Sequence, residues 1–257
     1  MPPQSCDGTS ANSLRSAITS MPRGTCAADG YLGKAVRFAL VVLFGMMIAL
    51  AMQTPARAQA KSPGGADYVT LKTPQSTEAP GKIEVIEFFW YGCPHCYSLE
   101  PALAPWVKAL PADVQFRRVP GIFDASWAVS ARVYYAFEAL GLTEKLHKPL
   151  FDAIHRDKLN IVIAKDRTPV LNEPLLREWL KKQGVDAEKF MGMYNSFGVD
   201  ANVKRASQLT RAYGLEGVPA IAVQGRHVVP AGNRILGIAD TLIAEERKKI
   251  APTAKKK

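Results

Sequence analysis

Residues 82–96 join a strand pattern to a pair of cysteines. They read Lys82-Ile83-Glu84-Val85-Ile86-Glu87-Phe88-Phe89-Trp90-Tyr91-Gly92-Cys93-Pro94-His95-Cys96. The first part is rich in β-branched and aromatic side chains without strict alternation, which is typical of a central strand buried on both faces. Proline is favoured just inside a helix start because its missing N–H has no partner there in any case. The sequence therefore predicts a strand followed by a helix, with Cys93 at the N-cap and Cys96 at the end of the first turn.

The segments on either side of this stretch predict an α/β protein. Residues 61–81 resemble a linker around a short strand at 67–72, and Val114–Val119 is a second strand. Residues 220–229 predict a hairpin that turns at Gln224-Gly225, and 238–250 an amphipathic closing helix. We expect Pro101 to kink the first helix or to end it near Glu100, and Pro105 to disfavour a long unbroken helix.

The segment between the second strand and the hairpin is predicted to be a helical insertion. Gly141 is expected to stop its first helix and Thr143 to cap the next one. The predicted helices cover 127–140, 143–157, 173–183, 187–197 and 200–213. The fold class is thus an α/β sheet interrupted by a helical block, with domain parts at 61–125, 126–214 and 215–257.

The N-terminal region predicts an export signal. Phe38–Met52 is an uncharged apolar run behind Lys34 and Arg37, followed by small residues up to Ala60. This order of basic, apolar and Ala-x-Ala segments is that of a secretory signal peptide. A membrane anchor is the alternative, although spanning needs about 20 apolar residues. We expect residues 1–60 to be removed by cleavage after Ala60.

Composition and charge exclude several classes of protein. The chain of 257 residues is 47% hydrophobic and 22% charged, which is globular and neither disordered nor fibrous. Without residues 1–60 it has 28 basic and 21 acidic residues, a net charge of +7. No basic stripe is interleaved with aromatic residues, so nucleic-acid binding is not expected. Cys93 and Cys96 are then the only cysteines left.

A Cys-x-x-Cys pair can be a zinc site, a structural disulfide or a redox dithiol. A closed zinc site needs four ligands, and no second Cys or His pair repeats the spacing, so no metal is expected. A disulfide that closes four residues stabilises a fold by only about 2 kcal/mol in the chain-entropy model. The redox interpretation is therefore favoured.

The expected position of Cys93 predicts whether the redox pair oxidises or reduces its clients. Unpaired N–H groups and the positive end of a helix dipole favour a thiolate over a thiol. His95, inside the loop, can add to this stabilisation. A stabilised thiolate stabilises the reduced protein, by roughly 30 mV for each pKa unit below ambient pH. We therefore expect oxidation of client thiols, with Cys93 as the attacked sulfur and Cys96 as the resolving one.

These residues resemble a known family. Glu87-Phe88-Phe89, then Cys93-Pro94-His95-Cys96-Tyr97, and far downstream Gly217-Val218-Pro219-Ala220, are similar to the periplasmic DsbA-type thiol:disulfide oxidoreductases. The similarity extends over about residues 67–250. It implies a thioredoxin fold with an inserted helical domain.

The resemblance also implies roles for particular residues. Pro219 would be cis and pack opposite Cys93, although sequence alone makes it a turn residue. Val218 would offer backbone hydrogen bonds to an extended client chain. Glu87 would be a buried acid with a raised pKa that handles the proton of Cys96, with Arg118 or Arg117 as its partner.

The expected function is that of a periplasmic dithiol oxidase. It would donate its disulfide to newly exported, unfolded proteins and be reoxidised by a DsbB-type quinone-linked membrane oxidase. No cofactor beyond the Cys93–Cys96 disulfide is implied, and a monomer is expected. Two alternatives stay open: a disulfide isomerase or reductase, and a client-binding chaperone in which the cysteine pair is incidental.

Overall fold

A computed structural model describes residues 68–250 of the chain. The predicted signal peptide, its cleavage point at Ala60 and the lysine-rich end of the chain lie outside these residues. Within 68–250 there is no helix with the length and apolar character that crossing a membrane requires.

The centre of the fold is a mixed sheet with the strand order β1-β7-β6-β2-β3. Its strands are β1 (Val69–Thr70), β2 (Ile83–Phe89), β3 (Val114–Pro120), β6 (Ala220–Val223) and β7 (His227–Pro230). β2 pairs parallel with β3 and antiparallel with β6, so it lies inside the sheet. All seven residues of β2 are buried, which confirms the predicted central strand.

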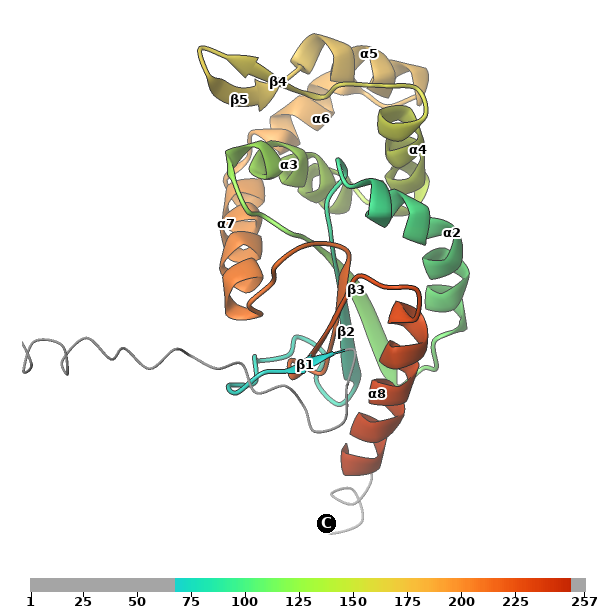
Figure 1. The fold of residues 1–257 in the computed structure, drawn as a ribbon. Helices are drawn as coiled ribbons and strands as arrows, with labels where there is room; N and C mark the ends of the chain where they lie inside the picture. Colours follow the sequence, from blue (N-terminus) through green and yellow to red (C-terminus); the bar gives the residue numbers. More distant parts are fainter. Residues whose placement is uncertain (1–67, 251–257) are drawn as a thin grey trace, which may run out of the picture. The chain divides into compact units, whose positions relative to one another are not determined.

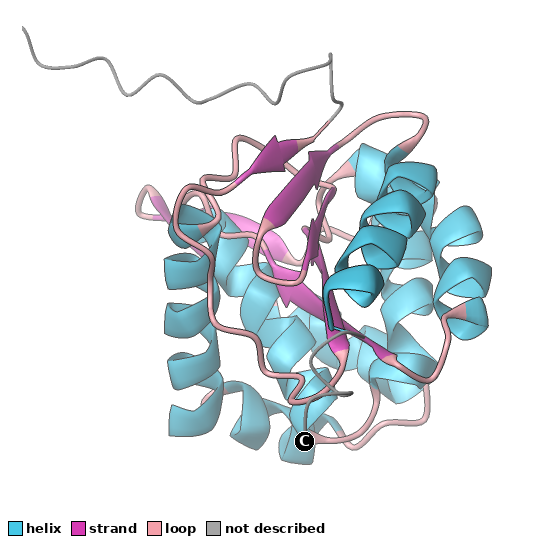
Figure 2. Ribbon diagram, turned by 90° about the horizontal axis from the view of Figure 1, so that it is seen from below, coloured by secondary structure: helices cyan, strands magenta, loops and turns pink. Residues whose placement is uncertain are grey.

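Helices cover both sides of this sheet (Figure 2). The helices are α2 (Pro94–Ala109), α3 (Ala125–Ala139), α4 (Thr143–His155), α5 (Glu173–Lys182), α6 (Ala187–Tyr194), α7 (Phe197–Ala212) and α8 (Ile235–Ile250). Val85 and Ile221 share one apolar cluster with Leu103 of α2 and Leu242 of α8. A second cluster joins the other side of the sheet to the helices of the insertion. The α/β class with an inserted helical block is confirmed.

Helix α2 corrects part of one expectation, that the helix ends or breaks at its prolines. The helix neither ends near Glu100 nor breaks at Pro105, but runs as one element to Ala109 with both prolines inside it. Each internal proline removes a backbone hydrogen bond and costs about 3 kcal/mol. Leu103 is fully buried between the two prolines, and the Trp106 indole donates to Asp240 of α8 over 2.8 Å. These tertiary contacts offset the local cost.

The insertion contains a hairpin that the sequence analysis does not predict. Residues 162–171 form a hairpin of β4 (Val162–Lys165) and β5 (Thr168–Leu171), which turns at Asp166 and Arg167 with positive φ at both residues. The predicted cap at Thr143 is also wrong. Leu142 occupies the N-cap position without a side-chain hydrogen bond, and Thr143 is already helical.

The C-terminal hairpin lies where the sequence placed it. Gln224 and Gly225 turn the chain with φ of 52° and 63°, in the left-handed region that tight hairpin turns use. A Cβ on Gly225 would lie 2.1 Å from the carbonyl oxygen of Gln75, so only glycine fits there. β6 also pairs antiparallel with β2, with Ala220 opposite Phe88, and the loop that precedes β6 therefore lies at the end of β2 where α2 begins (Figure 1).

Candidate active site

Cys93 caps the first turn of α2, as predicted. Its backbone is extended, Pro94 follows at the first helical position, and its sulfur accepts a hydrogen bond from the N–H of Cys96 over 3.4 Å. The pKa of Cys93 is lowered from 9.0 to about 6, chiefly by the hydrogen bond with the Cys96 side chain. Burial opposes this shift, while the backbone N–H groups of Cys96 and His95 and the charge of His95 support it. Cys93 therefore has the more stable thiolate of the pair.

Cys96 has the opposite character. Both cysteines are free thiols here, and Cys96 is completely buried whereas Cys93 keeps 7% of its surface. Burial raises the pKa of Cys96 well above its ordinary value, and the side chain and charge of Cys93 raise it further. A partner molecule can thus reach the sulfur of Cys93 more readily than that of Cys96.

The loop before β6 meets Cys93 directly. The Val218–Pro219 peptide bond is cis, and the Cys93 thiol lies 3.4 Å from the carbonyl oxygen of Val218. Gly121, in the loop after β3, approaches so closely that a Cβ there would lie 2.9 Å from a methyl group of Val218. The structure therefore brings Val218 to Cys93, and the peptide bond before Pro219 is cis as the resemblance implied.

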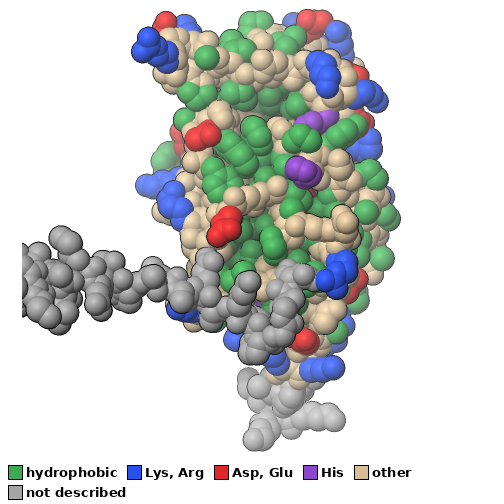
Figure 3. Space-filling view, viewed as in Figure 1, with side chains coloured by type: hydrophobic (Ala, Val, Ile, Leu, Met, Phe, Trp, Pro, Cys, Tyr) green, Lys and Arg blue, Asp and Glu red, His purple; other side chains and the backbone are tan. Residues whose placement is uncertain are grey.

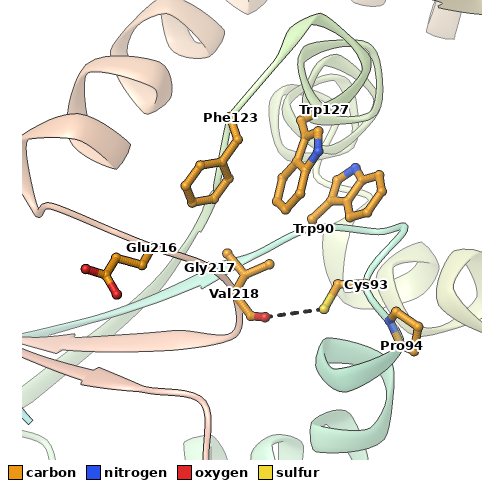
Figure 4. Close-up of a pocket in the computed structure, with 8 residues that line it drawn as sticks. All are labelled: Trp90, Cys93, Pro94, Phe123, Trp127, Glu216, Gly217 and Val218. Carbon is orange, nitrogen blue, oxygen red and sulfur yellow. Dashed lines mark hydrogen bonds between the residues drawn. The ribbon is translucent and has the colours of Figure 1, made fainter.

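An apolar pocket opens beside the sulfur (Figure 4). It is lined by Trp90, Cys93, Pro94, Phe123, Trp127, Glu216, Gly217 and Val218. The rings of Trp90 and Trp127 are stacked with centroids 4.1 Å apart, and Phe123 packs edge-on against Trp127 while 43% of its own surface is exposed. Hydrophobic side chains gather on the middle of the face seen in Figure 3, next to two histidines. An apolar segment of another chain fits such a surface.

The sequence did not reveal the aromatic side of this pocket. Trp127 was assigned only to a helix, and Phe123 to no element. Asp124 caps α3 by accepting hydrogen bonds from the N–H groups of Ser126 and Trp127, which fixes the first turn of that helix beside the cysteine loop. The only sequence signal was that Phe123 and Trp127 are large aromatic residues shortly after the strand at 114–119.

A buried charge cluster lies beneath the dithiol. Glu87 is fully buried in β2, and its Oε2 accepts from the Arg118 guanidinium over 2.9 Å. Arg117, the other expected partner, pairs instead with Glu84 and Glu78. Glu87 Oε1 is buried and has no hydrogen-bond partner within residues 68–250.

Burial controls the protonation of this acid. Desolvation raises the pKa of Glu87 from 4.5 to about 8, with Arg118 opposing the shift and Glu100 adding to it. Glu87 also raises the pKa of Cys96 through its charge. A carboxyl group with these properties can hold or release a proton near neutral pH.

Glu100 is a second buried acid that the sequence analysis used only as a helix boundary. It accepts from Arg118 over 3.4 Å and contacts Nε2 of His147 in α4 over 3.2 Å. Burial raises the pKa of Glu100, but His147 and Arg118 lower it more, so that the net pKa is below its ordinary value. Its spacing of four residues from Cys96 on one helix was the signal that could have found it.

Comparison with known proteins finds a matching family and similar sequences. A family described as DSBA-like thioredoxin domain matches residues 112–242. The chain is 37% identical to the thiol:disulfide interchange protein DsbA of Pseudomonas aeruginosa, covering 78% of this chain and 94% of that protein. It is 39% identical to DsbA of Burkholderia cepacia, covering 79% and 91%.

Solved structures agree with the sequence relatives. The crystal structure of Pseudomonas aeruginosa DsbA superposes with a TM-score of 0.64 at 38% identity, over 75% of this chain and 96% of that one. Oxidoreductase DsbA from Xylella fastidiosa superposes with a TM-score of 0.64 at 31% identity, over 72% and 97%.

The fold and the dithiol site define a thioredoxin-fold protein disulfide oxidoreductase with a helical insertion. Within that class, the chain belongs to the DsbA family. Proteins of this family work through a disulfide formed by their own cysteines, which matches the role expected of the Cys-x-x-Cys pair.

Proposed function

We propose that this protein is an exported dithiol oxidase that donates a Cys93–Cys96 disulfide to unfolded client proteins in the periplasm. The observation that supports this most strongly is the asymmetry of the two thiols. The pKa of Cys93 is lowered to about 6, while burial raises the pKa of Cys96. In the reduced protein, the charge is therefore best stabilised on the sulfur that faces clients.

The proposed reaction transfers two electrons from the client to the enzyme. A client thiolate attacks Cys93 Sγ, the Cys93–Cys96 bond breaks, and Cys96 leaves with the electron pair as a thiolate that takes up a proton. A second client thiolate then attacks the client sulfur of the mixed disulfide, and Cys93 leaves as the thiolate. The client gains a disulfide and the enzyme becomes the dithiol.

We assign the site residues as follows. Glu87 exchanges the proton of Cys96: its Oε1 is buried without a partner among residues 68–250, its pKa is raised, and its charge acts on Cys96. Pro94 begins the helix that stabilises the Cys93 thiolate, and His95 adds to that stabilisation from the exposed side of the first turn. Val218 and Pro219 form the loop against which the client chain is bound, adjacent to Cys93.

Other parts of the proposal concern the surroundings of the enzyme. Residues 1–60 are a signal segment cleaved near Ala60, and the mature chain comprises thioredoxin parts at 61–125 and 215–257 around the insertion at 126–214. The mature protein acts as a monomer without a metal or organic cofactor. A DsbB-type quinone-linked membrane oxidase restores its disulfide.

The test is oxidation of a reduced, unfolded client that has two cysteines, with the disulfide form of the protein in stoichiometric amount. We expect the wild type to oxidise the client and Cys93→Ser to abolish oxidation. Cys96→Ser, with Cys93 first activated as its mixed disulfide with thionitrobenzoate, should react with a client that has a single cysteine, release thionitrobenzoate and accumulate the Cys93–client mixed disulfide. Undiminished oxidation by Cys93→Ser would instead indicate a binding protein whose cysteines are incidental. A strongly reducing equilibrium with glutathione would indicate a reductase or isomerase.

A further inference from the structure

His147 connects the helical insertion to the buried charges beneath the dithiol. It lies on α4 and is 5% exposed. Its Nε2 lies 3.2 Å from Oε1 of Glu100, and its Nδ1 lies 3.0 Å from the hydroxyl of Tyr91, two residues before Cys93. Glu100 and Tyr91 are themselves buried, so each of these contacts is shielded from water.

The partners determine which nitrogen carries the proton. A carboxylate only accepts hydrogen bonds, so Nε2 donates to Glu100 and, in the neutral ring, Nδ1 accepts from the Tyr91 hydroxyl. Burial lowers the pKa of His147, which favours this neutral form, although the hydrogen bond and charge of Glu100 oppose the shift. His147 is therefore a fixed hydrogen-bond donor to Glu100 rather than a second cation.

The arrangement leaves one cation between two acids. Arg118 donates to Glu87 and to Glu100, and the same oxygen of Glu100 that contacts Arg118 also accepts from His147. The other charged groups that act on His147 are Arg118 from β3 and Glu144 from its own helix. The ring of Tyr134 in α3 also packs near His147, with the two ring centroids 6.1 Å apart.

We propose that His147 is a positioning residue for disulfide exchange: its hydrogen bond holds Glu100 as a carboxylate, so that Arg118 is shared between both acids and Glu87 is left to hold the exchangeable proton. Without that hydrogen bond Glu100 takes up a proton more readily, because a buried carboxylate needs its donors. Arg118 then neutralises Glu87 alone, and the like charge next to Glu87 is lost. The protonation of the two acids changes in opposite directions.

This inference rests on the role proposed for Glu87, and the chain provides a matched control for it. His227 is also buried, and its Nε2 contacts Glu246 over 3.1 Å, while its Nδ1 contacts Thr70. That pair is on β7 and α8 and contacts neither Arg118 nor Glu87. His227→Asn therefore breaks a buried histidine–glutamate bond of the same kind without reaching the dithiol.

The experiment is a carboxyl-carbon NMR titration of the reduced, glutamate-labelled protein, with Glu87→Gln and Glu100→Gln to assign the signals. His147→Asn keeps an amide near Tyr91 but cannot reach Glu100, whereas His147→Gln places a donor near the Nε2 position. We expect His147→Asn to raise the Glu100 midpoint and lower the Glu87 midpoint, each by about one pH unit. His147→Gln and His227→Asn should leave both midpoints close to those of the wild type.

Unchanged midpoints in His147→Asn, or equal changes in His227→Asn, would overturn the proposal. If His147→Asn does not fold, the nitrogen NMR signals of the His147 ring in the wild type provide the test. A proton on Nε2 supports the proposal, and a proton on Nδ1 instead of Nε2 contradicts the proposal. These readouts do not depend on clients. Failure of client oxidation would remove the proposed function and leave the titration interpretable, and the reverse also holds.

Discussion

Cys93 and Val218 are 125 residues apart in the sequence, yet the thiol of one lies 3.4 Å from the carbonyl oxygen of the other. The contact brings together the first turn of α2 and the loop before β6, which belong to two parts of the thioredoxin fold separated by the insertion. An attacking client must therefore approach Cys93 alongside Val218. The pocket lined by Trp90, Phe123 and Trp127 adjoins the same sulfur.

Replacing Trp127 should separate client binding from thiol chemistry. Trp127→Ala removes the ring stacked on Trp90, and we expect oxidation of an unfolded protein client to slow by about tenfold, as for the loss of a stacked aromatic contact of about 1.5 kcal/mol. The reaction with glutathione and the pKa of Cys93 should not change, because Trp127 makes no hydrogen bond to the sulfur. Parallel rates with the two substrates measure this.

The control for Trp127 is Phe197, which is 85% exposed at the start of α7 and does not line the pocket. Phe197→Ala should oxidise both substrates at wild-type rates. Equal slowing of glutathione and protein clients by Trp127→Ala would show that the pocket acts on the chemistry and not on binding.

His95→Ala should raise the pKa of Cys93 without restoring its ordinary value. The His95 charge lowers that pKa, but the hydrogen bond with Cys96 is the largest cause and the backbone N–H of residue 95 remains. We expect an increase of about one unit or less, and a reduction potential less oxidising by roughly 30 mV per unit. Thiolate absorbance and the glutathione equilibrium are the two measurements, and a lower pKa in this variant would contradict the assignment.

Glu87→Gln should remove a pH dependence of stability. The folded protein holds a proton on Glu87 up to about pH 8, whereas the unfolded chain loses it near 4.5. The stability that this proton contributes is complete below the unfolded pKa and is lost as pH rises through the folded pKa. Wild type should therefore lose more unfolding free energy than Glu87→Gln between these values, by up to about 1.4 kcal/mol per pH unit.

Urea unfolding of the reduced wild type and Glu87→Gln at several pH values tests this sign. Parallel curves for the two proteins would mean that Glu87 is ionised alike in the folded and unfolded states. In that case the acid could not exchange a proton with Cys96 near neutral pH.

Local patterns predicted those parts of the fold that local interactions determine. The strand at 83–89, the cap at Cys93 and the turn at Gln224-Gly225 depend on neighbouring residues and on backbone preferences. The path of α2 depends on distant contacts instead, because Leu103 and Trp106 pack against α8 and hold the helix together across Pro101 and Pro105. The hairpin at 162–171 was missed because Asp166 and Arg167 turn it without a glycine.

The site residues also fall into those that the sequence predicts and those that only the packing of distant helices brings together. The cysteines could be found from their motif, and the resemblance supplied Val218, Pro219 and Glu87. For Glu100 the only sequence signal was its spacing of four residues from Cys96, and for His147 there was none, since a buried acid and a buried histidine look like surface residues of α2 and α4 until the helices are packed together. Only the packing of α4 against α2 brings these two side chains within 3.2 Å of each other.

The central claim is that Cys93 is a stabilised thiolate in the reduced protein. Its most direct test is a titration of the thiolate ultraviolet absorbance of the reduced wild type, with the oxidised protein as the blank. The account predicts one thiolate per molecule appearing with a midpoint at about pH 6, while Cys96 stays protonated. A midpoint near 9, the ordinary value for a thiol, would contradict it.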